Sequence, residues 1–182
     1  FNRTTKSRWT KDFTTPTADV DIYSVDISYD ANANITGTVD NIHRAGAGTS
    51  ANRAFDVKYD LDGLNRITAA DEGTLSGGGG GSISNRTRKE IWTLEQTGNF
   101  DENKVDYNGD LDYADAGEIN DNRDHNNVNE IKTWAPSGVT KTVVHDKTGN
   151  MTDDGKEYKF VYDVRGRLKK IKNQSNALVA EY

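Results

Sequence analysis

The chain of 182 residues is 33% hydrophobic and 29% charged, carries a formal net charge of −6 and has no cysteine. This composition excludes disulfide bonds, gives no dominant basic field for nucleic acid, and leaves no apolar run long enough for membrane insertion as a helix. Thr, Tyr, Val, Ile, Gly and Asn are frequent, which is typical of short strands joined by tight turns. We therefore predict an all-β fold.

In chain order, residues 1–19 form a polar N-terminal segment that Trp9 and Phe13 could dock. Residues 20–29 alternate between apolar and polar side chains, which predicts a strand at the start of a repeat region over 20–182. Three stretches interrupt that region as insertions, and the second contains five consecutive glycines that we expect to form a flexible loop or hairpin tip. The insertions are 43–52, 73–88 and 101–122.

Six short units repeat within this region. Each has an anchor residue, usually aromatic or His, followed by Asp or Asn, a Gly or Asn turn and an apolar residue. Each unit predicts a strand, a turn and a second strand, so the array predicts stacked antiparallel β-hairpins that form a strip open at both ends. The anchors are Tyr29, Tyr59, Leu94, His125, His145 and Tyr162.

A single hairpin cannot bury its own apolar face, whereas stacked neighbours can. The array would then leave two unpaired strand edges, and such edges invite pairing with another strand. We expect the partners to be flanking repeats of the same polypeptide or further copies of this chain.

These units resemble the rearrangement-hotspot (RHS) or YD-repeat family. The motifs are Tyr59-Asp-x-x-Gly-Leu-Asn-Arg-Ile67, His145-Asp-x-x-Gly-Asn-Met-Thr152 and Tyr162-Asp-x-x-Gly-Arg-Leu168. The resemblance implies a continuous strip of β-hairpins, which spirals into a hollow shell in complete members. Bacterial members enclose a toxic C-terminal segment in that shell, and the insecticidal toxin complexes and teneurins share the architecture.

This chain departs from the family pattern in two respects. It has about six units, too few to enclose a cavity, and it lacks the Asp-Pro-x-Gly self-cleavage signature of bacterial shells. The resemblance therefore implies the β-repeat scaffold and gives no support for autoproteolysis or a toxin payload.

An acidic stretch over 106–118 carries oxygen-bearing side chains at every second position. Alternate oxygen ligands of this kind can converge on Ca²⁺, as in an EF-hand loop. Leu111 stands where that loop has Gly, and Gly117 stands at the twelfth position, so an ordinary acidic surface loop is the alternative. The candidate ligands for a structural Ca²⁺ are Asp106, Asn108, Asp110 and Asp112.

No recognisable catalytic arrangement is present, so we expect no enzyme activity. His125 and His145 hold anchor positions, and we interpret them as packing residues rather than as bases or ligands; His43 lies far from both in the sequence. Asp153 and Asp154 could form a catalytic carboxyl pair, but turn aspartates explain them. Asn-x-Ser/Thr sequons, which could carry glycans on a cell surface, occur at Asn2, Asn34, Asn85, Asn150 and Asn173.

The function that these features predict is a structural scaffold outside the cytoplasm, either extracellular or on the cell surface, which assembles edge to edge into a filament or larger shell. Two alternatives remain open. The chain could be a wall segment of an RHS toxin-encapsulating shell, or a surface adhesion module that binds glycans through exposed aromatic residues.

Overall fold

The computed structural model describes residues 3–11, 21–42, 55–136 and 138–182. It confirms the all-β prediction: antiparallel strands follow one another in chain order, with one short 3₁₀ turn. The chain divides into two compact units, one of Phe1–Thr93 with Lys104–Glu118 and the other of Leu94–Asn103 with Ile119–Tyr182. No helix in the described part of the chain has the length and apolar content needed to cross a bilayer.

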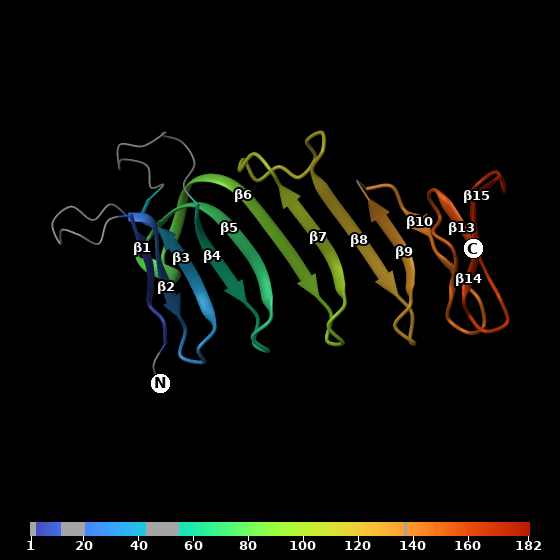
Figure 1. The fold of residues 1–182 in the computed structure, drawn as a ribbon, viewed down its shortest axis with the longest axis horizontal. Coiled ribbons are helices and arrows are strands. Elements are labelled where there is room, and N and C mark those ends of the chain that lie inside the picture. The colour runs from blue at the N-terminus through green and yellow to red at the C-terminus, as the bar shows by residue number, and fades with distance from the viewer. Residues whose placement is uncertain (1–2, 12–20, 43–54, 137) are drawn as a thin grey trace. The chain divides into compact units, whose positions relative to one another are not determined.

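The first unit is a sheet whose neighbouring strands are also neighbours in the sequence (Figure 1). Alternation decides which side of a strand is buried: in β5, Ala69, Asp71 and Leu75 lie on the buried face while the residues between them are half-exposed. The strands are β1 (Lys6–Thr10), β2 (Asp21–Tyr29), β3 (Ile35–Asp40), β4 (Asp56–Leu61), β5 (Ile67–Ser76) and β6 (Ser82–Leu94).

The glycine run closes a long hairpin between β5 and β6. Ser76 pairs with Ser82, and the 3₁₀ turn Gly78–Gly80 lies between them. Gly79 is buried, and a Cβ at this position would come within 2.0 Å of Thr36 Oγ1, so only glycine permits this close approach to β3. The predicted insertion 73–88 is therefore mostly paired strand, and Gly79 at its tip packs against the sheet.

The second unit contains shorter hairpins (Figure 1). Strands that follow one another in the sequence again pair side by side, except β10 (Lys141–Thr142) and β11 (Val144–His145), which belong to different sheets. Trp134 connects two of the hairpins, because its indole N–H donates to the Asp154 carbonyl at 2.9 Å. The strands are β8 (Ile119–His125), β9 (Ile131–Pro136), β10 (Lys141–Thr142), β11 (Val144–His145), β12 (Met151–Asp153), β13 (Tyr158–Tyr162), β14 (Leu168–Asn173) and β15 (Leu178–Glu181). The remaining strand, β7 (Phe100–Asp106), is divided between the two units.

The other predicted segments have different outcomes. The N-terminal segment contains β1, which pairs with β2, and Trp9 in it is 67% exposed. Phe13, His43 and the insertion 43–52 lie outside the described residues. Of the insertion 101–122, only the part between β7 and β8 is a loop.

Candidate functional site: the repeated turn and the acidic loop

One five-residue turn recurs seven times in the described residues. In the first copy, the N–H of Asp30 donates to the carbonyl of Asn34 at 3.0 Å, and the N–H of Ala33 donates to the carbonyl of Asp30 at 3.2 Å. The fourth residue always has a positive φ, between 61° and 95°, which explains why Gly and Asn are common there. The copies span 30–34, 62–66, 95–99, 126–130, 146–150, 163–167 and 173–177.

Where the first residue of the turn is Asp or Asn, its side chain accepts the backbone N–H of the fifth residue. Asp146 Oδ1 accepts the N–H groups of Thr148 at 2.8 Å and Asn150 at 3.0 Å. Hydrogen bonds from the Thr148 hydroxyl and the Asn150 amide, together with these N–H groups, hold the pKa of Asp146 far below its ordinary range. This carboxylate is a structural cap, and its low pKa makes it a poor general base.

The strand register confirms a common unit and revises one anchor. Tyr29 pairs with Ile35 and Tyr162 with Leu168, six residues later in each case, and a register shift directly precedes both anchors. In the second hairpin Leu61 holds this position against Ile67, whereas Tyr59 pairs with Ala70. The sequence alignment placed that anchor two residues too early, because it matched the aromatic side chain and not the six-residue spacing.

The other anchors follow the same rule. His125 pairs with Ile131, His145 pairs with Met151, and Leu94 directly precedes the turn at 95–99. The sequence analysis missed the seventh copy, in which Lys172 pairs with Leu178. Its anchor is not aromatic, and the available signal was the spacing of Asn173 and Asn176.

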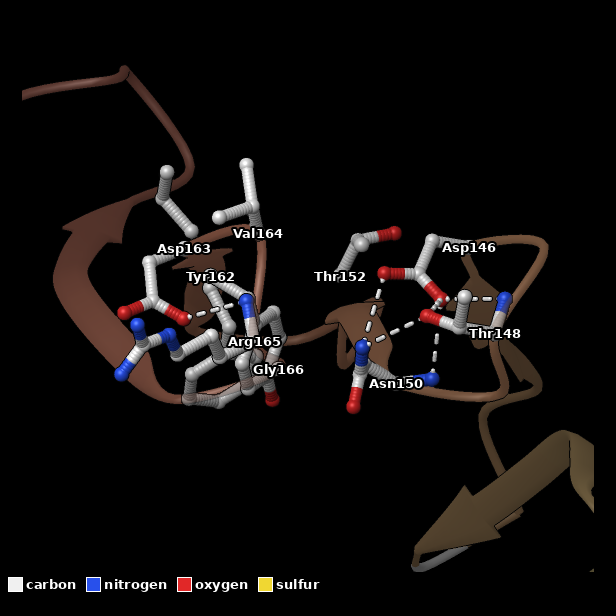
Figure 2. Close-up of a pocket in the computed structure, with 11 residues that line it drawn as sticks. Asp146, Thr148, Asn150, Thr152, Tyr162, Asp163, Val164, Arg165 and Gly166 are labelled. Carbon is white, nitrogen blue, oxygen red and sulfur yellow. Dashed lines mark hydrogen bonds between the residues drawn. The ribbon is translucent and has the colours of Figure 1, made fainter.

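An open groove of about 770 Å³ lies beside two successive turns of the second unit (Figure 2). Asp146, Asn150 and Arg165 are among its lining residues. The Asn150 amide donates to the Asp146 carboxylate at 3.0 Å, and the Arg165 N–H donates to Asp163 at 2.8 Å. The carboxylates of Asp146 and Asp163 in this groove are therefore engaged in holding the turns themselves.

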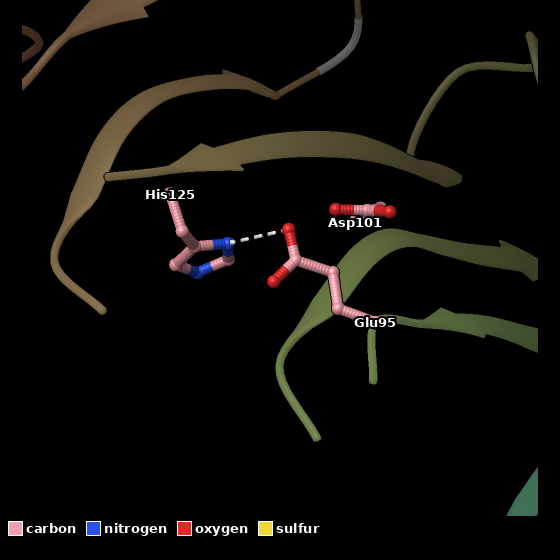
Figure 3. Close-up of side chains that lie close together, drawn as sticks. All are labelled: Glu95, Asp101 and His125. Atoms are coloured by element: carbon pink, nitrogen blue, oxygen red, sulfur yellow. Dashed lines mark ion pairs between the residues drawn. The ribbon is translucent and has the colours of Figure 1, made fainter. Parts of the chain in front are cut away.

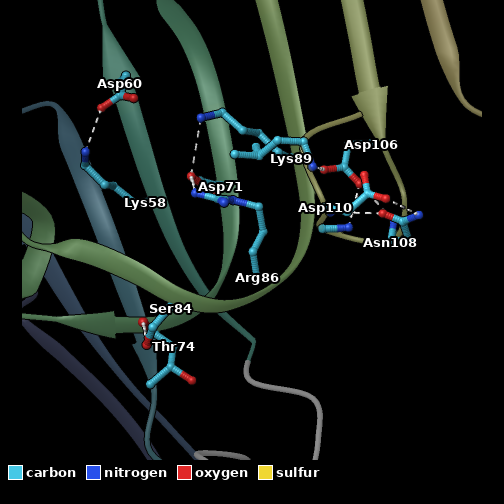
Figure 4. Close-up of polar contacts among 12 residues, drawn as sticks. Lys58, Asp60, Asp71, Thr74, Ser84, Arg86, Lys89, Asp106, Asn108 and Asp110 are labelled. Atoms are coloured by element: carbon cyan, nitrogen blue, oxygen red, sulfur yellow. Dashed lines mark hydrogen bonds and ion pairs between the residues drawn. The ribbon is translucent and has the colours of Figure 1, made fainter. Parts of the chain in front are cut away.

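The acidic loop is organised around Asp106, whose side chain is completely buried. Its carboxylate accepts the backbone N–H groups of Asn108 at 3.0 Å, Gly109 at 2.5 Å and Leu111 at 2.8 Å (Figure 4). Leu111 has a φ of 71°, the left-handed conformation that the EF-hand pattern assigns to glycine.

The remaining candidate calcium ligands also accept backbone N–H groups. Asn108 Oδ1 accepts from Asp110, and Asp110 Oδ1 accepts from Asp112, so each side chain closes a turn two residues long. These contacts hold the backbone of the loop. The Ca²⁺ site at Asp106, Asn108, Asp110 and Asp112 stays a prediction.

An ion pair that the sequence analysis missed lies beside this loop. Arg86 Nε and Nη2 donate to the two carboxylate oxygens of Asp71 at 2.5 and 2.8 Å (Figure 4). The hydrogen bond to Asp71 raises the pKa of Arg86. A Cβ on Gly109 would come within 2.2 Å of the Arg86 carbonyl, so the loop packs directly on the β6 backbone. These partners are 15 or more residues apart, and no local pattern connects them.

The fold and these sites define an array of antiparallel β-hairpins joined by a repeated capped turn. No family profile and no curated protein sequence matches the chain. A crystal structure of TcdB2-TccC3-TEV matches over 92% of this chain with a TM-score of 0.47 and 12% identity. A mutant of the Photorhabdus luminescens Tc holotoxin pore matches over 89% with a TM-score of 0.36 and 15% identity.

The chain spans 9% of the length of each of these two structures. At these TM-scores neither likeness carries an argument about family or function. The evidence for a hairpin array is the strand register and the turns of this chain.

Proposed function

We propose that this chain is a structural β-repeat scaffold that grows by the addition of hairpins, as in the RHS strip that its motifs resemble. The observation that carries the proposal is the turn that recurs seven times within the described residues with the same two backbone hydrogen bonds. A unit repeated in this way builds an extended sheet from nearest-neighbour contacts.

The edge strand β15 is the surface on which we expect growth. It pairs with β14 and is the last strand of its sheet in the described part of the chain. Leu178 and Val179 are 56% and 53% exposed there. An apolar edge strand of this kind is a template for another strand, supplied by the same polypeptide or by a second copy. A filament or shell wall outside the cytoplasm is the assembly that we propose.

A charged residue on the edge tests this assembly. We expect the wild-type chain to associate as its concentration rises, and Val179→Lys to reduce that association, because an edge lysine opposes strand pairing. Val164→Lys is the matched control, since Val164 is fully exposed at the tip of a turn and not on an edge. Sedimentation velocity and negative-stain microscopy measure the effect.

Two results would decide against the proposal. If the wild-type chain stays monomeric and its open reading frame encodes no further repeats, the scaffold has nothing to pair with. If Val164→Lys reduces association as much as Val179→Lys, the effect is one of net charge and not of the edge. An Asp-Pro-x-Gly motif downstream in that reading frame would favour the toxin-shell form of the scaffold.

A further inference from the structure

Three side chains with metal-binding chemistry meet in the second unit. Glu95 opens the turn at 95–99, Asp101 is the second residue of β7, and His125 is the last residue of β8. One ligand atom from each lies within 4.8 Å of the other two, and Figure 3 shows the imidazole facing the two carboxyl groups. The three come from separate strands and turns, so a shared ligand would join them.

His125 gives the observation that packing alone does not explain. Its side chain is only 8% exposed, and its Nδ1 atom is buried without a hydrogen-bond partner. That atom lies 3.7 Å from Glu95 Oε1, too far for a hydrogen bond. A buried polar atom left unsatisfied is costly, and an imidazole nitrogen is among the commonest metal ligands in proteins. An ion between these groups would satisfy it.

The two carboxyl groups also share a side-chain hydrogen bond. Burial, followed by the hydrogen bond and charge of Glu95, raises the pKa of Asp101, while the hydrogen bond from Asp101 lowers that of Glu95. Thr97 Oγ1 donates to Glu95 Oε2 at 3.2 Å and orients that side chain from the outside.

We propose that Glu95, Asp101 and His125 bind a divalent transition-metal ion such as Zn²⁺. One imidazole and two carboxylates form a mixed nitrogen and oxygen set that suits Zn²⁺, whereas Ca²⁺ and Mg²⁺ prefer oxygen alone. Two ligands at about 2.1 Å from a tetrahedral ion lie about 3.4 Å apart, whereas these ligand atoms lie within 4.8 Å of one another, so closure needs a contraction of up to about 1.4 Å. Water completes the tetrahedron.

The bound ion has a structural role in this proposal. It ties the turn at 95–99 and the start of β7 to the end of β8, three elements of the same unit. The proposal goes beyond the scaffold function and does not depend on it, because association through β15 involves other residues. Metal binding by a chain that stays monomeric would leave this inference intact.

Calorimetric titration of ZnCl₂ into the EDTA-treated full chain tests the site. We expect one Zn²⁺ per chain, and at least a tenfold weaker affinity for His125→Gln and for Asp101→Asn. His145→Gln is the matched control, because His145 holds the same hairpin position against Met151 and should bind as the wild type does. In EDTA, Asp101→Asn should be at least as stable as the wild type, since it removes a like-charge contact, and this separates metal binding from a folding defect.

Substitution with Co²⁺ gives a second readout. The visible d–d absorption of the bound Co²⁺ should change or disappear in His125→Gln and stay unchanged in His145→Gln. The proposal is overturned if the wild type takes up no Zn²⁺ at millimolar concentration, if His125→Gln binds it with unchanged affinity, or if Ca²⁺ displaces Zn²⁺ at equal concentration.

Discussion

The two units use the same turn but bury different groups. The largest side chains with almost no exposure all belong to the first unit: Leu75, Val105, Asp56, Asp106 and Ser24. In the described part of the second unit, Val143 is the one buried apolar side chain, and the strands are two to seven residues long. The second unit therefore consists of little more than the repeated hairpins, and closely spaced turns and strand pairing stabilise it.

The first unit differs from the second by its long β5–β6 hairpin and its acidic loop, which add buried polar side chains to the repeated hairpins. They bring polar groups out of water, and each buried carboxylate must then be satisfied within the protein. Asp56 accepts the N–H groups of Asp40 and Leu75, both at 2.8 Å, and Asp106 accepts three more in the acidic loop. Polar substitutions should therefore be much more damaging in the first unit than in the second.

The largest expected effect comes from removal of a buried cap. Asp106→Ala leaves three backbone N–H groups without their acceptor and should lower the free energy of unfolding by about 4 kcal/mol. Asp146→Ala removes a similar cap in the second unit, but Asp146 is exposed and water can replace it, so the loss should be far smaller. Urea unfolding at neutral pH measures both. Equal losses would contradict the contrast between the units.

Alanine substitutions at Gly109 and Gly166 separate the cost of backbone strain from the cost of a steric clash. Gly109 and Gly166 have φ values of 85° and 75°, so alanine is strained at both, by about 1–2 kcal/mol. At Gly109 the new Cβ would also collide with the Arg86 carbonyl, whereas at Gly166 it meets only Asn150 at 3.8 Å. Gly109→Ala should cost about 3 kcal/mol in total. Thermal melts that rank Gly166→Ala as the more damaging change would refute this explanation.

The two arginine pairs give the next comparison. Arg86→Lys should lower the free energy of unfolding by about 2 kcal/mol, since Lys cannot reproduce the two parallel hydrogen bonds to the largely buried Asp71. Arg167→Lys changes an exposed pair with Asp163 and should leave the unfolding midpoint unchanged. Salt should weaken the second pair more than the first. Denaturant titrations at low and high ionic strength provide the measurement.

The smallest expected effect is a change in acid sensitivity. The caps Asp146 and Asp163 have pKa values below the ordinary 3.8, mainly because the side chains and N–H groups of their turns donate to them. A pKa lowered by folding stabilises the protein above that ordinary value, and the stabilisation is lost as the pH falls from about 4.5 toward 2. Asp146→Asn/Asp163→Asn should flatten this loss, because Asn126 caps the same turn without titrating.

Asp101→Asn serves as a control for that experiment, because its effect on the pH dependence of stability should be opposite. Its pKa is raised by burial and by Glu95, so its ionisation destabilises the fold as the pH rises. The substitution should therefore increase stability near neutral pH and have little effect in acid. Melting curves from pH 2 to 8 distinguish the two patterns, and the same acid slope in all variants would show that other groups control it.

The sequence predicted the hairpins and most of their turns, because turn chemistry and strand alternation are local. It misplaced Tyr59 because residue type guided the alignment, although hydrogen bonding makes the spacing from anchor to partner six residues. Gly79 packs against Thr36 because glycine has no side chain. Thr36 lies far away in the sequence, so the glycine run by itself predicted only a flexible loop.

The cluster around His125 lay beyond the reach of sequence reasoning for a related reason. Glu95 and Asp101 are 24 to 30 residues away in the chain, and only the strand pairing brings them to the imidazole. The anchor position predicted a packing residue at His125, but nothing in the pattern indicated a buried imidazole nitrogen without a hydrogen-bond partner. In the acidic loop the spacing suggested a Ca²⁺ site, which stays a prediction, and the structure adds that the same side chains cap the loop backbone.

The capped loop also has a consequence for chemical ageing. Asn108-Gly109 is the dipeptide most prone to deamidation, a reaction in which the glycine nitrogen attacks the asparagine amide to form a succinimide. Here that nitrogen donates its hydrogen to Asp106, and the Asn108 amide donates to Asp110 and Asp115. The folded loop holds both reactants apart from the geometry of attack. Isoaspartate at position 108 would therefore record how often this loop opens during the lifetime of the molecule.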